Sequence, residues 1–253
     1  MNKKAILPNL ISISNLLLGF LAILLIFTDK PGLACWFIVI AAILDGLDGT
    51  IARLIKTSSP FGAQVDSLVD TVSFGVAPSV LIYKVALEQL GFLGMIFSFV
   101  PLLCGVLRLA RFNTAKKKKA NFTGMPITTS GIILASFYLY LTSPGNSIMT
   151  ANIWFSLIPA VSLLMISPIP YRRMPVVQLN GSKNPGFSVA VLLSASAFVL
   201  WNPALAIFPL MVIYILTGPI EWMVSHARGL KERDEDNMLS AESTTKRNRR
   251  RPK

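Results

Sequence analysis

Long apolar runs follow one another along almost the whole chain, and this feature most limits what the chain can fold into. A helix needs about 20 mostly apolar residues to span the hydrocarbon core of a bilayer, and runs of this kind occupy most of the 253 residues. Charged residues make up only 14% of the sequence, whereas soluble domains average about 25%. The sequence therefore predicts an all-α, polytopic helical membrane protein.

Eight segments are predicted as transmembrane helices, over residues 9–28, 33–53, 62–83, 91–112, 126–142, 151–168, 186–201 and 203–223. Pro and Gly near several of these boundaries support them, because both residues favour helix ends and turns. Only a Trp-Asn-Pro sequence separates the last two segments, so these could be a tight hairpin or one broken element. One membrane domain is predicted over residues 1–230. The basic tail over 231–253 is too polar to bury a core and is expected to be disordered.

The distribution of basic residues predicts the orientation. With eight spans both termini lie on one side, and if that side is cytoplasmic, all Lys and Arg residues except Lys30 and Lys84 fall in cytoplasmic segments. This bias follows the positive-inside rule, so both termini are predicted to be cytoplasmic in a multi-pass protein of the cytoplasmic membrane. No small-residue cleavage site follows the first apolar run, which is therefore interpreted as a retained helix and not as a signal peptide.

The net charge of +12 could suggest a nucleic-acid partner. The basic residues lie instead between apolar runs and in the tail, as membrane topology requires, so no nucleic-acid partner is predicted. Both cysteines, Cys35 and Cys104, lie inside apolar runs and are interpreted as packing residues. Since His226 is the single histidine, any metal site is expected to use oxygen ligands.

Four of the twelve acidic residues fall inside or at the ends of apolar segments, namely Asp45, Asp48, Asp66 and Asp70. A charged residue at the membrane centre costs roughly 2.5–3.5 kcal/mol, so four of them indicate a function. The first two are three residues apart and the last two are four apart, so each pair shares a helix face. A short polar connection would bring both pairs together near the cytoplasmic surface. Because clustered carboxylates repel one another without cations, the pattern favours bound Mg²⁺ or Mn²⁺, and two ions could be held.

The neighbours of these acids help to distinguish a phosphate ligand from a bare cation. Gly46 and Gly49, with Gly62 at the start of the third helix, would let a bulky ligand approach the backbone, or would only allow close helix packing. Arg53 lies one turn beyond Gly49 and can pair with a phosphate. A cation transporter is the alternative class of function, but transporter acids usually lie near the bilayer midplane, whereas this cluster is predicted near one face.

Residues 45–70 read DGLDGTIARLIKTSSPFGAQVDSLVD. They match the signature D-x2-D-G-x2-A-R-x8-G-x3-D-x3-D at every fixed position, and the chain therefore resembles the CDP-alcohol phosphatidyltransferases. Four further motifs resemble the branch of that family that uses L-serine: PNLISISNLLLGF at 8–20, DSLVDTVSFGVAP at 66–78, RLARFN at 108–113 and F-x-G-x-P at 122–126. One departure is MPITT at residues 125–129, where relatives often have Leu-Pro-Ser/Thr-Pro-Ala.

The resemblance implies a transferase that moves the phosphatidyl group from CDP-diacylglycerol to the hydroxyl of L-serine and releases CMP. The implied ligands of Mg²⁺ or Mn²⁺ are Asp45, Asp48, Asp66 and Asp70, and Asp70 is also the implied general base. The implied CDP-binding residues are Asp48, Gly49, Arg53 and Gly62. A homodimer is expected on the same ground. Glycerol 3-phosphate, inositol or choline as acceptor stays open, as does an ether-linked lipid.

Two arginines at the cytoplasmic end of the fourth predicted helix are candidates for binding the acceptor. Arg108 and Arg111 are three residues apart, and at least one is predicted to bind the serine carboxylate or a phosphate oxygen. Asn113 could assist. The alternative is that both arginines only mark topology, like the lysines at 116–119. Their position closer to the membrane favours a binding role.

Overall fold

The computed structural model describes residues 6–55, 60–114, 124–143, 151–169, 171 and 201–224. Every regular element in these ranges is helical, which confirms the predicted all-α class. In chain order the elements are α1 (Ile6–Phe27), α2 (Pro31–Ile55), α3 (Pro60–Asp70), η2 (Thr71–Val76), α4 (Ala77–Ile82), η3 (Tyr83–Leu87), η4 (Glu88–Leu90), α5 (Phe92–Thr114), α6 (Ile127–Thr142) and α7 (Ala151–Ile166). A further helix spans Pro203–Val224.

Helices long and apolar enough to cross a membrane lie at Leu10–Phe27, Pro31–Thr50, Phe61–Leu90, Phe92–Thr114 and Pro203–Val224. Shorter apolar helices lie at Ile127–Thr142 and Ile153–Ile166. Many large apolar side chains on these helices are exposed, among them Phe20, Phe27 and Leu93. Such a surface is suited to contact with lipid tails and not with water. The chain is therefore a helical membrane protein.

The predicted segment 186–201 lies outside the described residues except for Trp201, and the tail at 231–253 lies wholly outside them. Each of the other predicted segments coincides with a helix or, for 62–83, with a run of helical elements from α3 to η3. The total of eight spans and the side on which each terminus lies therefore stay predictions.

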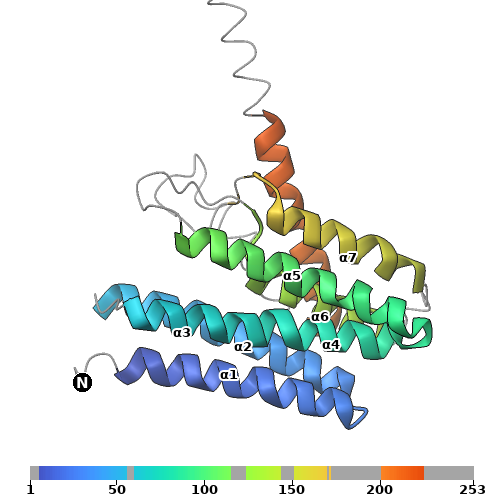
Figure 1. The fold of residues 1–253 in the computed structure, drawn as a ribbon, viewed down its shortest axis with the longest axis horizontal. Coiled ribbons are helices and arrows are strands. Elements are labelled where there is room, and N and C mark those ends of the chain that lie inside the picture. Colours follow the sequence, from blue (N-terminus) through green and yellow to red (C-terminus); the bar gives the residue numbers. More distant parts are fainter. Residues whose placement is uncertain are drawn as a thin grey trace, which may run out of the picture.

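The helices α2 and α3 run antiparallel, and the end of α2 and the start of α3 lie at the same end of the molecule as the start of α1 and the end of α5 (Figure 1). Pro60 opens α3, a position where the missing N–H of proline costs no helical hydrogen bond. We call this end the acidic end, because the four membrane carboxylates of α2 and α3 lie near it. The turns from α1 to α2 and from η4 to α5 lie at the opposite end (Figure 1).

The π-helical segment η2 directly follows Asp70 and packs tightly against α1. A Cβ added to Gly19 would lie only 2.4 Å from Ser73 Oγ, so the two backbones approach as closely as a glycine allows. The Ser73 hydroxyl donates a hydrogen bond to the carbonyl of Asn15 at 3.1 Å. π-helical turns often occur beside functional sites. Here the turn fixes the end of α3, and with it Asp70, against α1.

The segment before α6 is joined to the end of α7 by two backbone hydrogen bonds. The amide of Gly124 donates to the carbonyl of Ile169 at 2.9 Å, and that of Met125 donates to Leu164 at 3.0 Å. Gly124 has a φ of +86°, and a Cβ there would lie 2.2 Å from the carbonyl oxygen of Met165. Both observations require glycine. The glycine of the F-x-G-x-P motif therefore sets where α6 begins.

Candidate metal-binding active site

Three aspartates from two helices converge at the acidic end. Asp45 comes from α2, and Asp66 and Asp70 come from the face of α3 that their four-residue spacing predicts. Each offers a carboxylate oxygen, and these three oxygens all lie within 4.8 Å of one another. One oxygen of Asp70, Oδ1, is buried without a hydrogen-bond partner among the described residues. This set of oxygen ligands fits a hard divalent cation such as Mg²⁺ or Mn²⁺.

Asp48 occupies a different environment on the same helix. It is buried and accepts a hydrogen bond from the Ser12 hydroxyl of α1. Its other oxygen, Oδ1, is buried and has no hydrogen-bond partner within the described part of the chain. The structure thus gathers three of the four predicted carboxylates within 4.8 Å and places Asp48 against α1. A metal-binding role for Asp48 stays a prediction.

A threonine of α6 holds Asp45 in place. The Thr128 hydroxyl donates a hydrogen bond to Asp45 Oδ2 at 3.2 Å, across 83 positions of sequence. Partners of this kind orient a ligand before metal binds. No pattern in the sequence predicts a role for Thr128. The departure of the MPITT segment at 125–129 from the family pattern is the one local signal at this position.

Arg108 of α5 is the cation that attracts Asp70. Its side chain is partly buried, and its Nε has no hydrogen-bond partner among the described residues. Tyr214, from the helix Pro203–Val224, lies near Arg108 and forms a side-chain hydrogen bond with Thr129 of α6. The sequence gives no signal for Tyr214, because nothing in an apolar helix marks one tyrosine as facing an arginine 106 residues earlier. Arg108 is thus placed beside the acidic cluster with donor capacity for an anion.

The other two predicted acceptor residues are engaged with neighbouring helices. Arg111 donates through a guanidinium N–H to the carbonyl of Ile166, at the end of α7, at 3.2 Å. Cations are favourable at the C-terminal end of a helix. The Asn113 amide donates to Ser67 Oγ at 3.0 Å, so it braces the α3 turn between two of the clustered aspartates. Binding of the acceptor by either residue stays a prediction.

The glycines on α2 leave open space beside the carboxylates. A Cβ added to Gly46 or Gly49 would meet nothing within 4 Å, so close helix packing does not explain either residue among the described parts of the chain. The open space is compatible with the bulky ligand predicted beside these glycines, and that role stays a prediction. Arg53 lies one turn beyond Gly49 on the backbone of α2, and its side chain lies outside the described residues.

Fold and site together define a helical membrane protein that holds a cluster of carboxylates, with an adjacent arginine, near one end of its helix bundle. Residues 5–163 match the CDP-alcohol phosphatidyltransferase family, and the match includes all four membrane aspartates. The chain belongs to this family. It is accordingly a membrane transferase of phospholipid biosynthesis.

Curated relatives extend the match beyond the signature. A CDP-diacylglycerol–serine O-phosphatidyltransferase of Helicobacter pylori is 34% identical over 228 residues, covering 88% of this chain and 93% of the relative. An archaetidylserine synthase of Methanothermobacter thermautotrophicus is 40% identical, covering 69% of this chain and 75% of its own. A CDP-diacylglycerol–serine O-phosphatidyltransferase of Bacillus subtilis is 41% identical over 51% of this chain and 72% of its own.

Proposed function

We propose that the protein transfers the phosphatidyl group of CDP-diacylglycerol to the hydroxyl of L-serine, giving phosphatidylserine and CMP. The observation that carries this proposal is the convergence of Asp45, Asp66 and Asp70 inside the family signature. The acceptor is supported by the names of the relatives, since the bacterial and the archaeal names both specify a serine product or substrate. The two names specify different lipids, a diacylglycerol derivative and an archaetidyl lipid. A donor with ether-linked chains should therefore be compared with CDP-diacylglycerol in the same reaction.

Metal binding is assigned to Asp45, Asp66 and Asp70, with Asp48 as the fourth ligand. Bound Mg²⁺ or Mn²⁺ would neutralise the charge on the pyrophosphate and stabilise CMP as it leaves. Thr128 orients Asp45 for this task through its hydrogen bond. Contact with the CDP group is assigned to the signature residues Asp48, Gly49, Arg53 and Gly62. The open space beside Gly49 supports this part of the proposal.

Asp70 is proposed as the general base. Its carboxylate takes the proton of the serine hydroxyl as that oxygen bonds to the phosphorus attached to the diacylglycerol oxygen. The bond from this phosphorus to the CMP oxygen breaks, and its electron pair leaves with CMP. The buried Oδ1 of Asp70, which has no hydrogen-bond partner among the described residues, supports this role. The lipid tails stay in the bilayer, while serine and CMP exchange with water at the acidic end.

The acidic end is proposed to face the cytoplasm in the cytoplasmic membrane, because nearly all basic residues fall on that side. Serine then enters the site from the cytoplasm, and CMP leaves into it. A homodimer is proposed from the resemblance to the family. The lipid bilayer is the remaining partner.

Replacing Arg108 with Gln is expected to raise the KM for serine by about tenfold or more, because a charge-assisted hydrogen bond to a carboxylate is lost. Arg111→Gln is expected to raise it less, since Arg111 already donates to Ile166. Steady-state rates of CMP release, measured over a range of serine concentrations, give the KM of both variants. An unchanged KM in Arg108→Gln together with a raised KM in Arg111→Gln would reverse the assignment.

An acceptor panel tests the proposed function. The protein purified in detergent is given CDP-diacylglycerol and Mg²⁺ or Mn²⁺, with serine, glycerol 3-phosphate, inositol or choline in separate reactions. CMP release and a phosphatidylserine product are expected with serine alone. CMP release with glycerol 3-phosphate but not with serine would overturn the assignment of serine as the acceptor. Cation flux in liposomes without any lipid turnover would instead support a transporter.

A further inference from the structure

A groove of about 440 Å³ lies between α1, α4 and α5, in the half of the molecule away from the acidic end. Most of its wall is apolar, with side chains from these three helices and from the end of η2: Ile26, Val76, Val80, Met95, Phe99 and Leu102. None of the clustered aspartates lines it. The groove is therefore separate from the candidate active site, and its apolar wall suits a hydrocarbon chain.

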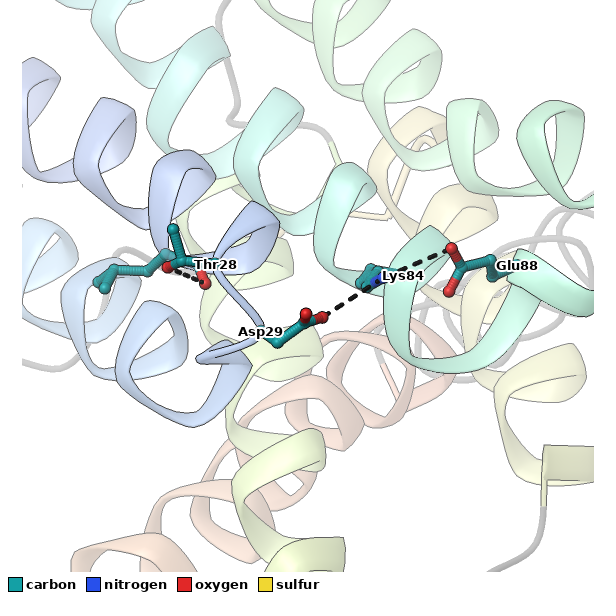
Figure 2. Close-up of polar contacts among 5 residues, drawn as sticks. Thr28, Asp29, Lys84 and Glu88 are labelled. Atoms are coloured by element: carbon teal, nitrogen blue, oxygen red, sulfur yellow. Dashed lines mark hydrogen bonds and ion pairs between the residues drawn. The ribbon is translucent and has the colours of Figure 1, made fainter.

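Three charged side chains stand at the outer end of this groove. Lys84 Nζ lies 3.4 Å from an oxygen of Asp29, in the turn after α1, and 3.4 Å from an oxygen of Glu88 (Figure 2). Lys84 and Glu88 both line the groove. The lysine therefore sits between two carboxylates, and the group carries a net charge of about −1. An ammonium has three N–H donors, so one remains for a further acceptor.

One polar atom deeper in the groove has no partner among the residues that the structure describes. Ser79 lines the groove, is only 7% exposed, and its hydroxyl oxygen has no hydrogen-bond partner in the described part of the chain. Serine in a membrane helix normally bonds a carbonyl one turn back. A buried hydroxyl without a partner is costly, so an acceptor supplied by a ligand would stabilise it.

These features follow one another along the helix in the order of the parts of a phospholipid. Lys84 lies at the end of the bundle, Ser79 lies five residues deeper (about 7.5 Å of helical rise), and Val76 lies about 4.5 Å deeper again. We propose that the groove binds a phospholipid of the leaflet opposite the active site. Its phosphate contacts Lys84, an ester carbonyl accepts from the Ser79 hydroxyl, and one acyl chain lies along the apolar wall.

The two carboxylates select the headgroup. A headgroup that carries only a phosphate would bring a second anion toward Asp29 and Glu88, and like charges at this distance repel. A zwitterionic aminophospholipid such as phosphatidylethanolamine supplies a phosphate for Lys84 and an ammonium for the carboxylates. The site is therefore assigned to an aminophospholipid in preference to an anionic lipid without an amine.

Native mass spectrometry of the full chain in detergent tests this proposal with phosphatidylethanolamine and phosphatidylglycerol as the two probes. The wild-type protein is expected to retain the first lipid preferentially. Lys84→Gln should weaken its binding about tenfold, and Ser79→Ala about threefold. Lys30→Gln is the matched control, because Lys30 lies at the same end but does not line the groove; its binding should equal that of the wild type.

The results of this experiment distinguish an aminophospholipid from another lipid and from a second copy of the chain as the occupant of the groove. Equal retention of both lipids, or equal retention by wild type and Lys84→Gln, would overturn the headgroup assignment. Retention of no lipid, with a second copy of the chain as the only added mass, would overturn the lipid site and indicate an interface between two chains. Phosphatidyl transfer is not part of the measurement, so the result does not depend on the proposed reaction.

Discussion

Asp70→Asn is expected to abolish phosphatidyl transfer while the protein stays folded. Asparagine keeps the shape of the side chain, but its amide cannot accept the proton of the attacking hydroxyl and is a weaker ligand for a hard cation. Loss of a general base alone typically costs 10²–10⁴-fold in rate, so a fall of at least about 10³-fold in kcat is expected once metal binding is also weakened. CMP release with saturating serine and CDP-diacylglycerol measures it.

The fold should survive this change for an electrostatic reason. Asp70 belongs to a group of carboxylates within 4.8 Å, and its Oδ1 has no hydrogen-bond partner among the described residues. Neutralising one member removes repulsion, so the melting temperature without metal should equal or exceed that of the wild type. Glu221→Gln, an exposed carboxylate on the helix Pro203–Val224, is the matched control and should retain full activity. Activity above one-tenth of wild type in Asp70→Asn would remove the general-base role.

Removal of divalent metal is expected to have the second large effect. Chelation with EDTA should stop turnover entirely, and Mg²⁺ or Mn²⁺ should restore it. Ca²⁺ should restore less, because it prefers more ligands at longer distances than this set of three oxygens favours. A protein that keeps its full rate after chelation and buffer exchange would contradict the metal site.

A second readout makes the metal prediction independent of activity. Without cations the clustered carboxylates repel one another, so added metal should raise the melting temperature as ligand binding to the folded state requires. The rise should be smaller in Asp70→Asn and in Asp66→Asn, and unchanged in Glu221→Gln. Equal shifts in all four proteins would place the bound ion somewhere other than this cluster.

Local spacing was enough to predict the elements that carry the site. The three-residue and four-residue intervals of the aspartates predict shared helix faces, and the short polar link between α2 and α3 predicts the antiparallel hairpin seen in Figure 1. Hydropathy located each described helix. These properties depend on neighbours within a few turns, which is the range over which a sequence pattern acts.

Contacts between distant segments were beyond such patterns. The Ser12 bond that places Asp48 against α1, and the Thr128 bond to Asp45, each join two helices. Side-chain partners across helices depend on rotation and depth, and periodicity fixes neither one. The same limit applies to the arginines. Spacing put Arg108 and Arg111 on one face, but only the structure shows that Arg111 meets α7.

The hydrogen bonds of Asp48 and Asp45 have a consequence for how the chain enters the membrane. Asp48 is paired with Ser12 of α1, so the first two helices already contain its partner when they emerge from the ribosome. The Asp45 partner, Thr128, follows 83 residues later. Until α6 has been made, the Asp45 carboxylate must therefore be protonated or stay in contact with water. Asp45 therefore gains this partner only when α6 is in place, whereas the partner of Asp48 is present within the first two helices.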